Sequence, residues 1–74
     1  MKSLAELVKQ KRKETGLNQM EFADRAGVAL TVIRKIEQGK TDLQLDKVNQ
    51  VLRMFGYVMT PVLSNEISSI RNDM

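Results

Sequence analysis

The stretch "GLNQMEFADRAGVALTVIRKIEQGK", residues 16–40, decides the fold. Glycines divide it, and between them the apolar residues recur at intervals of three and four, which is the spacing of amphipathic helices rather than of strands. Asn18 and Glu21 have the spacing of a capping box at the start of one helix, and Gly27 has the position of a left-handed residue that ends it. A second helix follows and ends at Gly39. The stretch therefore predicts two short helices joined by a glycine turn.

One further helix is expected on each side of this stretch. Ser3 and Glu6 form a second capping box, so a first helix begins just after Ser3 and ends at Gly16. A fourth helix begins within residues 41–45 and closes at Gly56. The side chains expected to face the core are Leu4, Leu7, Val8, Phe22, Ala23, Ala26, Val32, Ile33, Ile36, Leu45, Val48, Leu52 and Phe55, with Met20, Met54 and Met59 filling gaps in the core or in an interface.

The pattern changes after the fourth helix. The segment "YVMTPVL", residues 57–63, alternates and is rich in β-branched residues, which predicts a short strand. Pro61 cannot donate a hydrogen bond to a sheet, so the strand has to lie at an edge. Because no second strand is predicted in the chain, we expect the same strand of a second copy to pair with it. The residues assigned to this dimerisation strand are Tyr57, Val58, Met59, Thr60 and Val62.

Composition limits the function. A chain of 74 residues forms one domain, and the absence of cysteine and histidine excludes disulfides and leaves no predicted metal site or cofactor. With no paired carboxylates on a cleft and no phosphate-binding glycine loop, we do not expect an enzyme. The net charge of +3 suits nucleic acid. No signal peptide or membrane-spanning run is visible, so the expected location is the cytoplasm, in association with the nucleoid, with no membrane partner.

The central stretch is typical of a DNA-reading motif. Two short helices around a glycine turn, the second with a polar and basic outer side, describe a helix-turn-helix whose second helix enters the major groove. Taken alone, the neighbouring residues Arg34 and Lys35 are more often an ordinary solvated face. Within the glycine framework, DNA contact becomes the favoured interpretation.

The same stretch resembles the Cro/CI-type (XRE) helix-turn-helix domains over about residues 4–56. The positions that match their pattern are Gly16, Leu17, Gln19, Glu21, Ala23, Gly27, Val28, Ile33, Ile36, Glu37, Gly39 and Lys40. The resemblance implies an all-α, four-to-five-helix lambda-repressor-like DNA-binding domain in residues 1–56, with the helix-turn-helix at about 18–38. A dimerisation strand at 57–63, which pairs across a homodimer, and a mobile tail at 64–74 complete the expected organisation.

The resemblance also implies roles for single residues. Arg12 and Glu37 correspond to a structural salt bridge between the first and third helices, and Gln19 to a phosphate contact. Three more DNA-contact positions are expected readers of base edges: Leu30, Thr31 and Lys35. Two are expected phosphate contacts: Arg34 and Lys40. The last DNA-contact position is Ala29, which stands where such domains place a Ser or Thr cap. The apolar Leu30 and Val32 either contact thymine methyl groups or pack in the core.

A helical domain followed by a strand further resembles the HipB-like antitoxins of the HipA/HipB class. This resemblance implies a homodimeric, sequence-specific repressor that binds a double-stranded operator with twofold-related half-sites, autoregulates its operon and binds a HipA-type kinase toxin. The alternatives are a stand-alone phage- or plasmid-type Cro/CI-like regulator without a toxin, and a small helical scaffold that no longer binds DNA.

Overall fold

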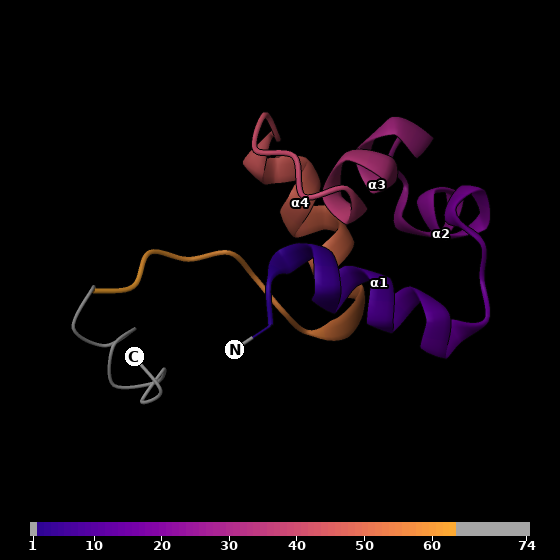
Figure 1. Ribbon diagram of the computed structural model, residues 1–74, viewed down its shortest axis with the longest axis horizontal. Helices are drawn as coiled ribbons and strands as arrows, with labels where there is room; N and C mark the ends of the chain where they lie inside the picture. The colour runs from indigo at the N-terminus through magenta and orange to yellow at the C-terminus, as the bar shows by residue number, and fades with distance from the viewer. Residues whose placement is uncertain (1, 64–74) are drawn as a thin grey trace.

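The computed structural model describes residues 2–63, and the predicted tail at 64–74 lies outside them. Within the described residues the chain is helical (Figure 1), which confirms the all-α expectation. The elements, in order, are α1 (Leu4–Thr15), α2 (Gln19–Ala26), α3 (Leu30–Glu37), α4 (Leu45–Leu52) and the 3₁₀ turn η1 (Arg53–Phe55). No helix in this part of the chain has the length and apolar character needed to cross a membrane.

The two predicted capping boxes are present. The Ser3 hydroxyl accepts from the Glu6 amide at 3.1 Å while the Glu6 carboxylate accepts from the Ser3 amide at 3.0 Å. At α2 the corresponding distances between Asn18 and Glu21 are 2.8 and 3.0 Å. Each box satisfies backbone donors that a helix start leaves without partners, so α1 and α2 begin where the sequence predicted.

The predicted turn at Gly27 is a Schellman motif. Gly27 has φ +76°, its amide donates to the Asp24 carbonyl, and the Val28 amide donates to the Ala23 carbonyl. A side chain would strain this left-handed conformation, which explains the glycine. The motif reverses the chain and starts α3 across α2.

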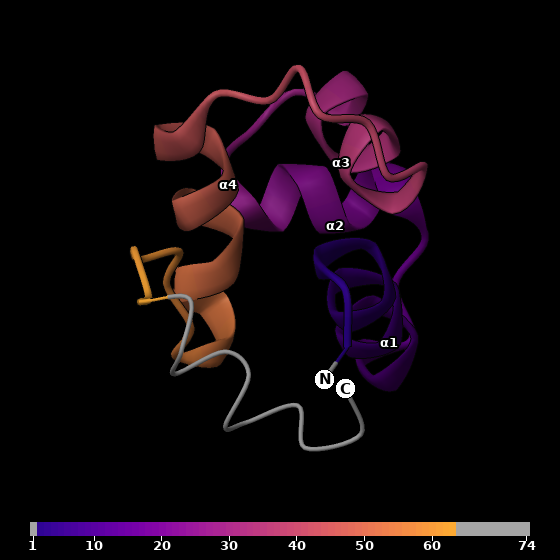
Figure 2. The same cartoon turned by 60° about the vertical axis from the view of Figure 1, so that its left-hand side comes forward.

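The core lies where α3 meets the other three helices (Figure 2). Phe22 is fully buried on α2, and its ring stacks on Phe55 of η1 with centroids 5.7 Å apart. This contact fastens the end of the fourth helical segment to the helix-turn-helix. The buried apolar side chains are Val8, Phe22, Ala23, Ala26, Ile33, Ile36, Val48, Val51 and Leu52.

Some core predictions were wrong. Leu45 is 59% exposed because it occupies the first turn of α4, and Val51 takes part in the core instead. Met20 is 65% exposed, and Met54 and Met59 are also exposed, so none of these methionines fills the core of the single chain. Leu45 fits the helical spacing of Val48, but spacing does not tell whether another element covers a helix end.

Residues 57–63 carry no strand assignment within the described part of the chain. A strand is defined by a hydrogen-bonded neighbour, and this chain supplies none among those residues. The segment instead runs back past α4, where the Met59 amide donates to the Asn49 side chain at 2.7 Å. The predicted pairing joins two copies, and it stays a prediction.

Candidate nucleic-acid interface

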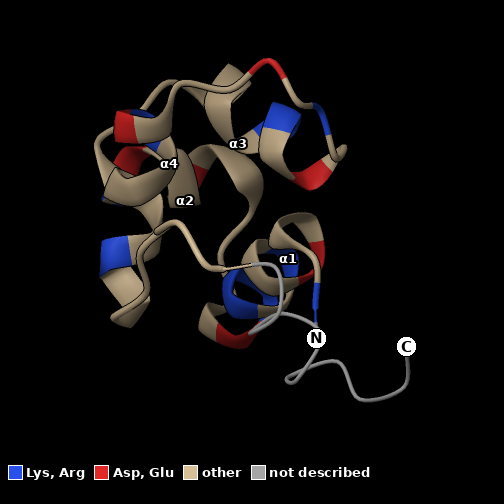
Figure 3. Cartoon of the chain, turned by 90° about the vertical axis from the view of Figure 1, so that its left-hand side faces the viewer, with Lys and Arg blue, Asp and Glu red and all other residues tan. Residues whose placement is uncertain are grey.

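The two sides of α3 differ in chemistry. Ile33 and Ile36 are buried on the inner side, whereas Thr31, Arg34 and Lys35 are exposed on the outer side. Figure 3 shows basic and acidic residues interspersed over the helices and their connections rather than segregated into one basic face. The inner isoleucines fix the rotation of α3 about its axis, so the polar side chains are presented outward from a packed helix.

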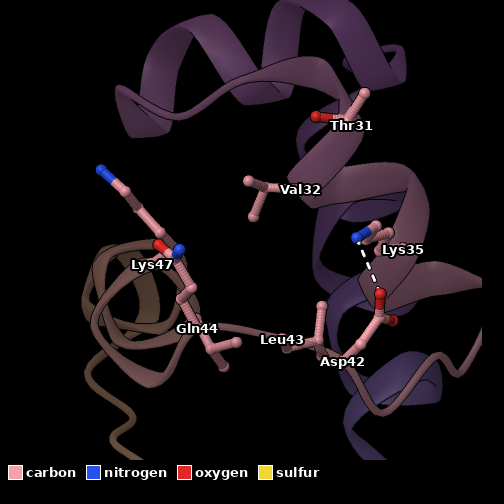
Figure 4. Close-up of a pocket in the computed structure, with 8 residues that line it drawn as sticks. Thr31, Val32, Lys35, Asp42, Leu43, Gln44 and Lys47 are labelled. Carbon is pink, nitrogen blue, oxygen red and sulfur yellow. Dashed lines mark hydrogen bonds and ion pairs between the residues drawn. The ribbon is translucent and has the colours of Figure 1, made fainter.

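Lys35 has an acidic neighbour outside its own helix. Its Nζ lies 2.9 Å from Oδ2 of Asp42 in the connection to α4, and both side chains are exposed (Figure 4). The hydrogen bond from Lys35 lowers the pKa of Asp42, so the carboxylate stays charged at neutral pH. An exposed pair of this kind is worth little stability, because water competes for both groups. Lys35 can therefore exchange Asp42 for another acceptor.

A shallow hollow of about 240 Å³ lies between α3 and the start of α4. Thr31 and Lys35 line its α3 side, and Asp42, Gln44 and Lys47 line the other. Figure 4 shows Lys35 directed toward Asp42, whereas Lys47 extends away from that pair. The volume is below the ~300 Å³ typical of small-molecule sites. The hollow belongs to the polar surface beside the outer face of α3.

A buried carboxylate links the first three helices. Glu37, at the end of α3, is only 8% exposed. Its Oε2 accepts from Arg12 Nε at 2.7 Å, and its Oε1 accepts from Arg12 Nη2 and from the Gln19 amide nitrogen, both at 3.1 Å. Arg12 Nη1 also donates to the Leu17 carbonyl at 3.0 Å. The bidentate pair thus holds α1, the start of α2 and the end of α3 at fixed positions.

Two opposing effects act on the Glu37 carboxyl. Burial raises the pKa of Glu37, but the hydrogen bonds from Arg12 and Gln19 outweigh burial and leave that pKa below its ordinary value. The carboxylate therefore remains ionised at neutral pH. Gln19 uses one amide proton on Glu37, which leaves its second amide proton for another acceptor.

The start of α3 lacks a side-chain cap. Ala29 occupies the cap position with φ −69° and ψ 150°, and no side chain there accepts from the helix. The missing cap costs roughly 1 kcal/mol relative to Ser or Thr. Leu30 and Val32, for which the sequence left two roles open, are half-buried and pack against the core. Thr31 is thus the first outward polar side chain of the helix.

The predicted DNA-contact residues lie in two places: most are on an exposed surface at α3, and one is at the buried junction around Glu37. Thr31, Arg34, Lys35 and Lys40 are exposed on α3 and just after it, whereas Gln19 is half-buried at the Glu37 junction. Sequence reasoning missed Asp42. Asp42 lies seven positions after Lys35, but α3 ends at Glu37 between them, so the helical period does not relate the two residues.

Sequence reasoning also missed the contact between α4 and the glycine turn. Gln50 Nε2 donates to the Ala26 carbonyl at 3.1 Å and to the Gly27 carbonyl at 2.9 Å. A Cβ added at Gly27 would lie 3.0 Å from that nitrogen. Gln50 therefore satisfies the last carbonyls of α2 and holds the turn before α3 against α4.

Comparison with known proteins agrees with this geometry. A family model described as Helix-turn-helix (HTH_3) matches residues 8–58. A protein of Sinorhizobium fredii (strain NBRC 101917 / NGR234), named "Uncharacterized HTH-type transcriptional regulator y4mF", is 48% identical over 50 residues. The matched region spans 68% of this chain and 66% of the relative, which is slightly less than two thirds of the relative's length.

Proposed function

The chain belongs to the helix-turn-helix family HTH_3, and from this premise we propose that it binds duplex DNA and represses transcription. The observation that carries the proposal is the outer face of α3, where Thr31, Arg34 and Lys35 are exposed while Ile33 and Ile36 bury the opposite side. A rigid helix with a polar, basic outer face fits the major groove. The name of the Sinorhizobium relative, a transcriptional regulator, supports the same class of function.

In the proposed complex α3 enters the major groove with its N-terminal end foremost. Thr31 donates to or accepts from a base edge, and Lys35 leaves Asp42 to donate to guanine O6 or N7. Arg34 and Lys40 contact phosphates, which position the protein without reading sequence. Gln19 adds a phosphate contact through its second amide proton, while Glu37 holds its side chain in place.

The proposal includes a homodimer. A single helix-turn-helix reads only a few base pairs, whereas a twofold dimer reads two half-sites about one helical turn apart. The exposed apolar side chains of the C-terminal segment, Tyr57, Val58, Met59, Val62 and Leu63, are consistent with an interface there. The expected operator is therefore a double-stranded site with twofold symmetry.

A narrower proposal is that the dimer is a HipB-like antitoxin, which binds a HipA-type kinase toxin while it represses the shared promoter. The order of the elements, a helical domain followed by an apolar extended segment, supports this proposal. The alternative is a stand-alone regulator. Copurification from the native host separates them: a kinase-sized partner that coelutes with the dimer supports the antitoxin, and a dimer that elutes alone supports the stand-alone regulator.

The test of DNA binding is a fluorescence-anisotropy titration against the duplex just upstream of the gene, at several salt concentrations. We expect tight binding whose logarithm falls steeply with the logarithm of salt. Lys35→Ala and Thr31→Ala should weaken operator binding more than binding to a shuffled duplex. Lys13→Ala, which removes the same charge from the exposed end of α1, is the matched control. Equal effects of Lys13→Ala and Lys35→Ala on both duplexes would contradict the assignment of α3 as the reader.

A further inference from the structure

We propose that Gln50 of α4 is a positioning residue for DNA reading, because it holds the uncapped start of α3 in place through the glycine turn. Gln50 is half-buried against that turn and is not among the predicted DNA-contact residues. The inference rests on the proposed function and specifies what fixes the reading end of the helix. Figure 2 shows the chain between α2 and α3 passing beside α4.

The side-chain amide of Gln50 binds two consecutive carbonyl groups of the turn. Its Nε2 lies 3.1 Å from the Ala26 carbonyl oxygen and 2.9 Å from the Gly27 carbonyl oxygen. A primary amide has two N–H donors, so each carbonyl can take one of them. Because the two carbonyls belong to neighbouring residues, the pair of bonds fixes the orientation of the turn as well as its distance from α4.

This close contact depends on the glycine. A Cβ at position 27 would lie 3.0 Å from Gln50 Nε2, which is closer than such atoms normally approach each other. A side chain would also strain the left-handed conformation of Gly27, which has φ +76°. The turn and Gln50 are therefore matched, since the amide occupies the space that a side chain at position 27 would need.

The start of α3 needs support from outside the helix. Ala29 supplies no side-chain cap, and the first fully buried side chain of the helix is Ile33, one turn later. The apolar residues between them are only half-buried, and Thr31 is exposed. The first turn of α3 therefore takes its position from the residues just before it, whose carbonyls Gln50 binds.

The two ends of α3 have different anchors. Glu37 at the C-terminal end is bonded to Arg12 and Gln19, so that junction joins α3 to α1 and α2. The N-terminal end, which is proposed to enter the groove, carries Thr31 and is held through the turn by Gln50. Loss of the Gln50 amide should therefore shift the base-reading end, while the phosphate contacts nearer the other end remain.

Removal of the amide is the first test. Gln50→Leu keeps the approximate size of the side chain and deletes both hydrogen bonds. Operator affinity in the anisotropy titration should fall about 10-fold, as expected for loss of one base contact. Affinity for the shuffled duplex should stay within about threefold of wild type with the same salt dependence, because phosphate contacts supply both. An unchanged ratio of operator to shuffled affinity overturns the proposal.

Gln10→Leu is the matched control. The Gln10 amide donates at 3.0 Å to Glu14, so the same chemical change removes a hydrogen bond within α1. This variant should keep the wild-type ratio of operator to shuffled affinity. Circular dichroism at the assay temperature establishes that both variants are folded. If Gln50→Leu weakens binding to both duplexes equally, Gln50 acts only on stability and the positioning role is wrong.

Because Gln50 acts in place of a cap, a new cap should compensate for its loss. Ala29→Ser supplies a side-chain acceptor for the first turn of α3. It should raise operator affinity about fivefold in the Gln50→Leu background and less than about twofold in wild type, where the helix start is already held. Any contact of the new hydroxyl with DNA is present in both backgrounds and cancels in the comparison. Equal gains in the two backgrounds overturn the proposal.

Hydrogen exchange without DNA separates failure of this inference from failure of the proposed function. The Val32 amide donates to the Ala29 carbonyl at 3.0 Å, so its exchange reports whether the first turn of α3 is formed. Exchange there should be about fivefold faster in Gln50→Leu than in Gln10→Leu. Equal rates mean that the inference fails even where wild type reads its operator. If wild type binds neither duplex in a salt-sensitive way, the proposed function fails, and the exchange rates still decide whether Gln50 holds the helix start.

Discussion

Two ion pairs on α3 have similar lengths and different surroundings. At the junction with α1 and α2, Arg12 Nε lies 2.7 Å from Glu37 Oε2, and the side chains are 15% and 3% exposed. On the outer side of α3, Lys35 Nζ lies 2.9 Å from Asp42 Oδ2, and the side chains are 46% and 70% exposed. The distances alone would rank the two pairs as equals. Burial separates them.

The difference teaches which polar groups hold the domain together and which remain available for a ligand. A carboxylate that is removed from water depends on its cation, and loss of that cation leaves an uncompensated buried charge. A solvated pair loses almost nothing when it opens, because water replaces each partner. The buried Glu37 junction therefore fixes where α3 lies. The exposed Lys35 ammonium, by contrast, can leave Asp42 and pair with a group on DNA.

The largest effect is expected from breaking the buried pair. Arg12→Met should lower the free energy of unfolding by about 3 kcal/mol, because Glu37 remains buried without its cation. Urea denaturation followed by circular dichroism measures the change. The double variant Arg12→Met/Glu37→Leu should recover most of the loss, since neither charge then remains. If the double variant is no more stable than Arg12→Met, buried charge is not the cause.

The second effect concerns DNA rather than stability. Lys35→Ala should weaken operator binding roughly 10-fold or more, as expected for loss of one base contact, and leave the urea midpoint unchanged. Lys35→Arg keeps a cation with different geometry and should retain the non-specific part of the affinity. Anisotropy titrations beside urea melts test this separation. A fall in stability comparable to that of Arg12→Met would remove the contrast between the two pairs.

Acid should act on the buried pair with a definite sign. The pKa of Glu37 is lowered in the folded chain, so its stabilising effect is present above the ordinary glutamate pKa and is lost as the pH falls through the folded value. Wild type should therefore lose stability below about pH 4.3 more steeply than Arg12→Met/Glu37→Leu. Thermal melts from pH 7 to pH 3 compare the two proteins. Parallel pH profiles would contradict the assignment.

The smallest effect is expected at Asp42. Asp42→Asn should not change the urea midpoint, because the carboxylate is solvated. It should strengthen binding to shuffled DNA, since the change removes a negative charge beside Lys35, and thereby lower the preference for the operator. Parallel titrations with operator and shuffled duplexes measure that ratio. Asp46→Asn, an exposed acid in the first turn of α4, is a matched change in charge away from Lys35.

Local signals in the sequence accounted for most of the helical framework. Capping boxes and left-handed glycines act over three to five residues, and for that reason Ser3, Asn18, Gly16 and Gly27 marked helix ends correctly. Helical spacing did not tell that Leu45 would lie in an uncovered first turn, because coverage depends on neighbouring elements.

Contacts between different elements could not be predicted from the spacing of residues in the sequence. Gln50 reaches the carbonyls of Ala26 and Gly27, and Asn49 accepts from Met59, each across a distance that no local pattern encodes. The outer face of α3 could be predicted because apolar and polar residues alternate there with the period of a helix. The partner of Lys35 was not, because it lies on a loop.

The caps of the helices also bear on the order in which the chain folds. α2 has a side-chain box at its start and a Schellman turn at its end, and all of these hydrogen bonds are local. α3 has no cap at its start and needs α1, α2 and α4 to bury Ile33 and Ile36. Local bonds form before distant ones, because they close short loops. Substitutions at Asn18 should therefore slow refolding, whereas substitutions on the inner side of α3 should mainly speed unfolding.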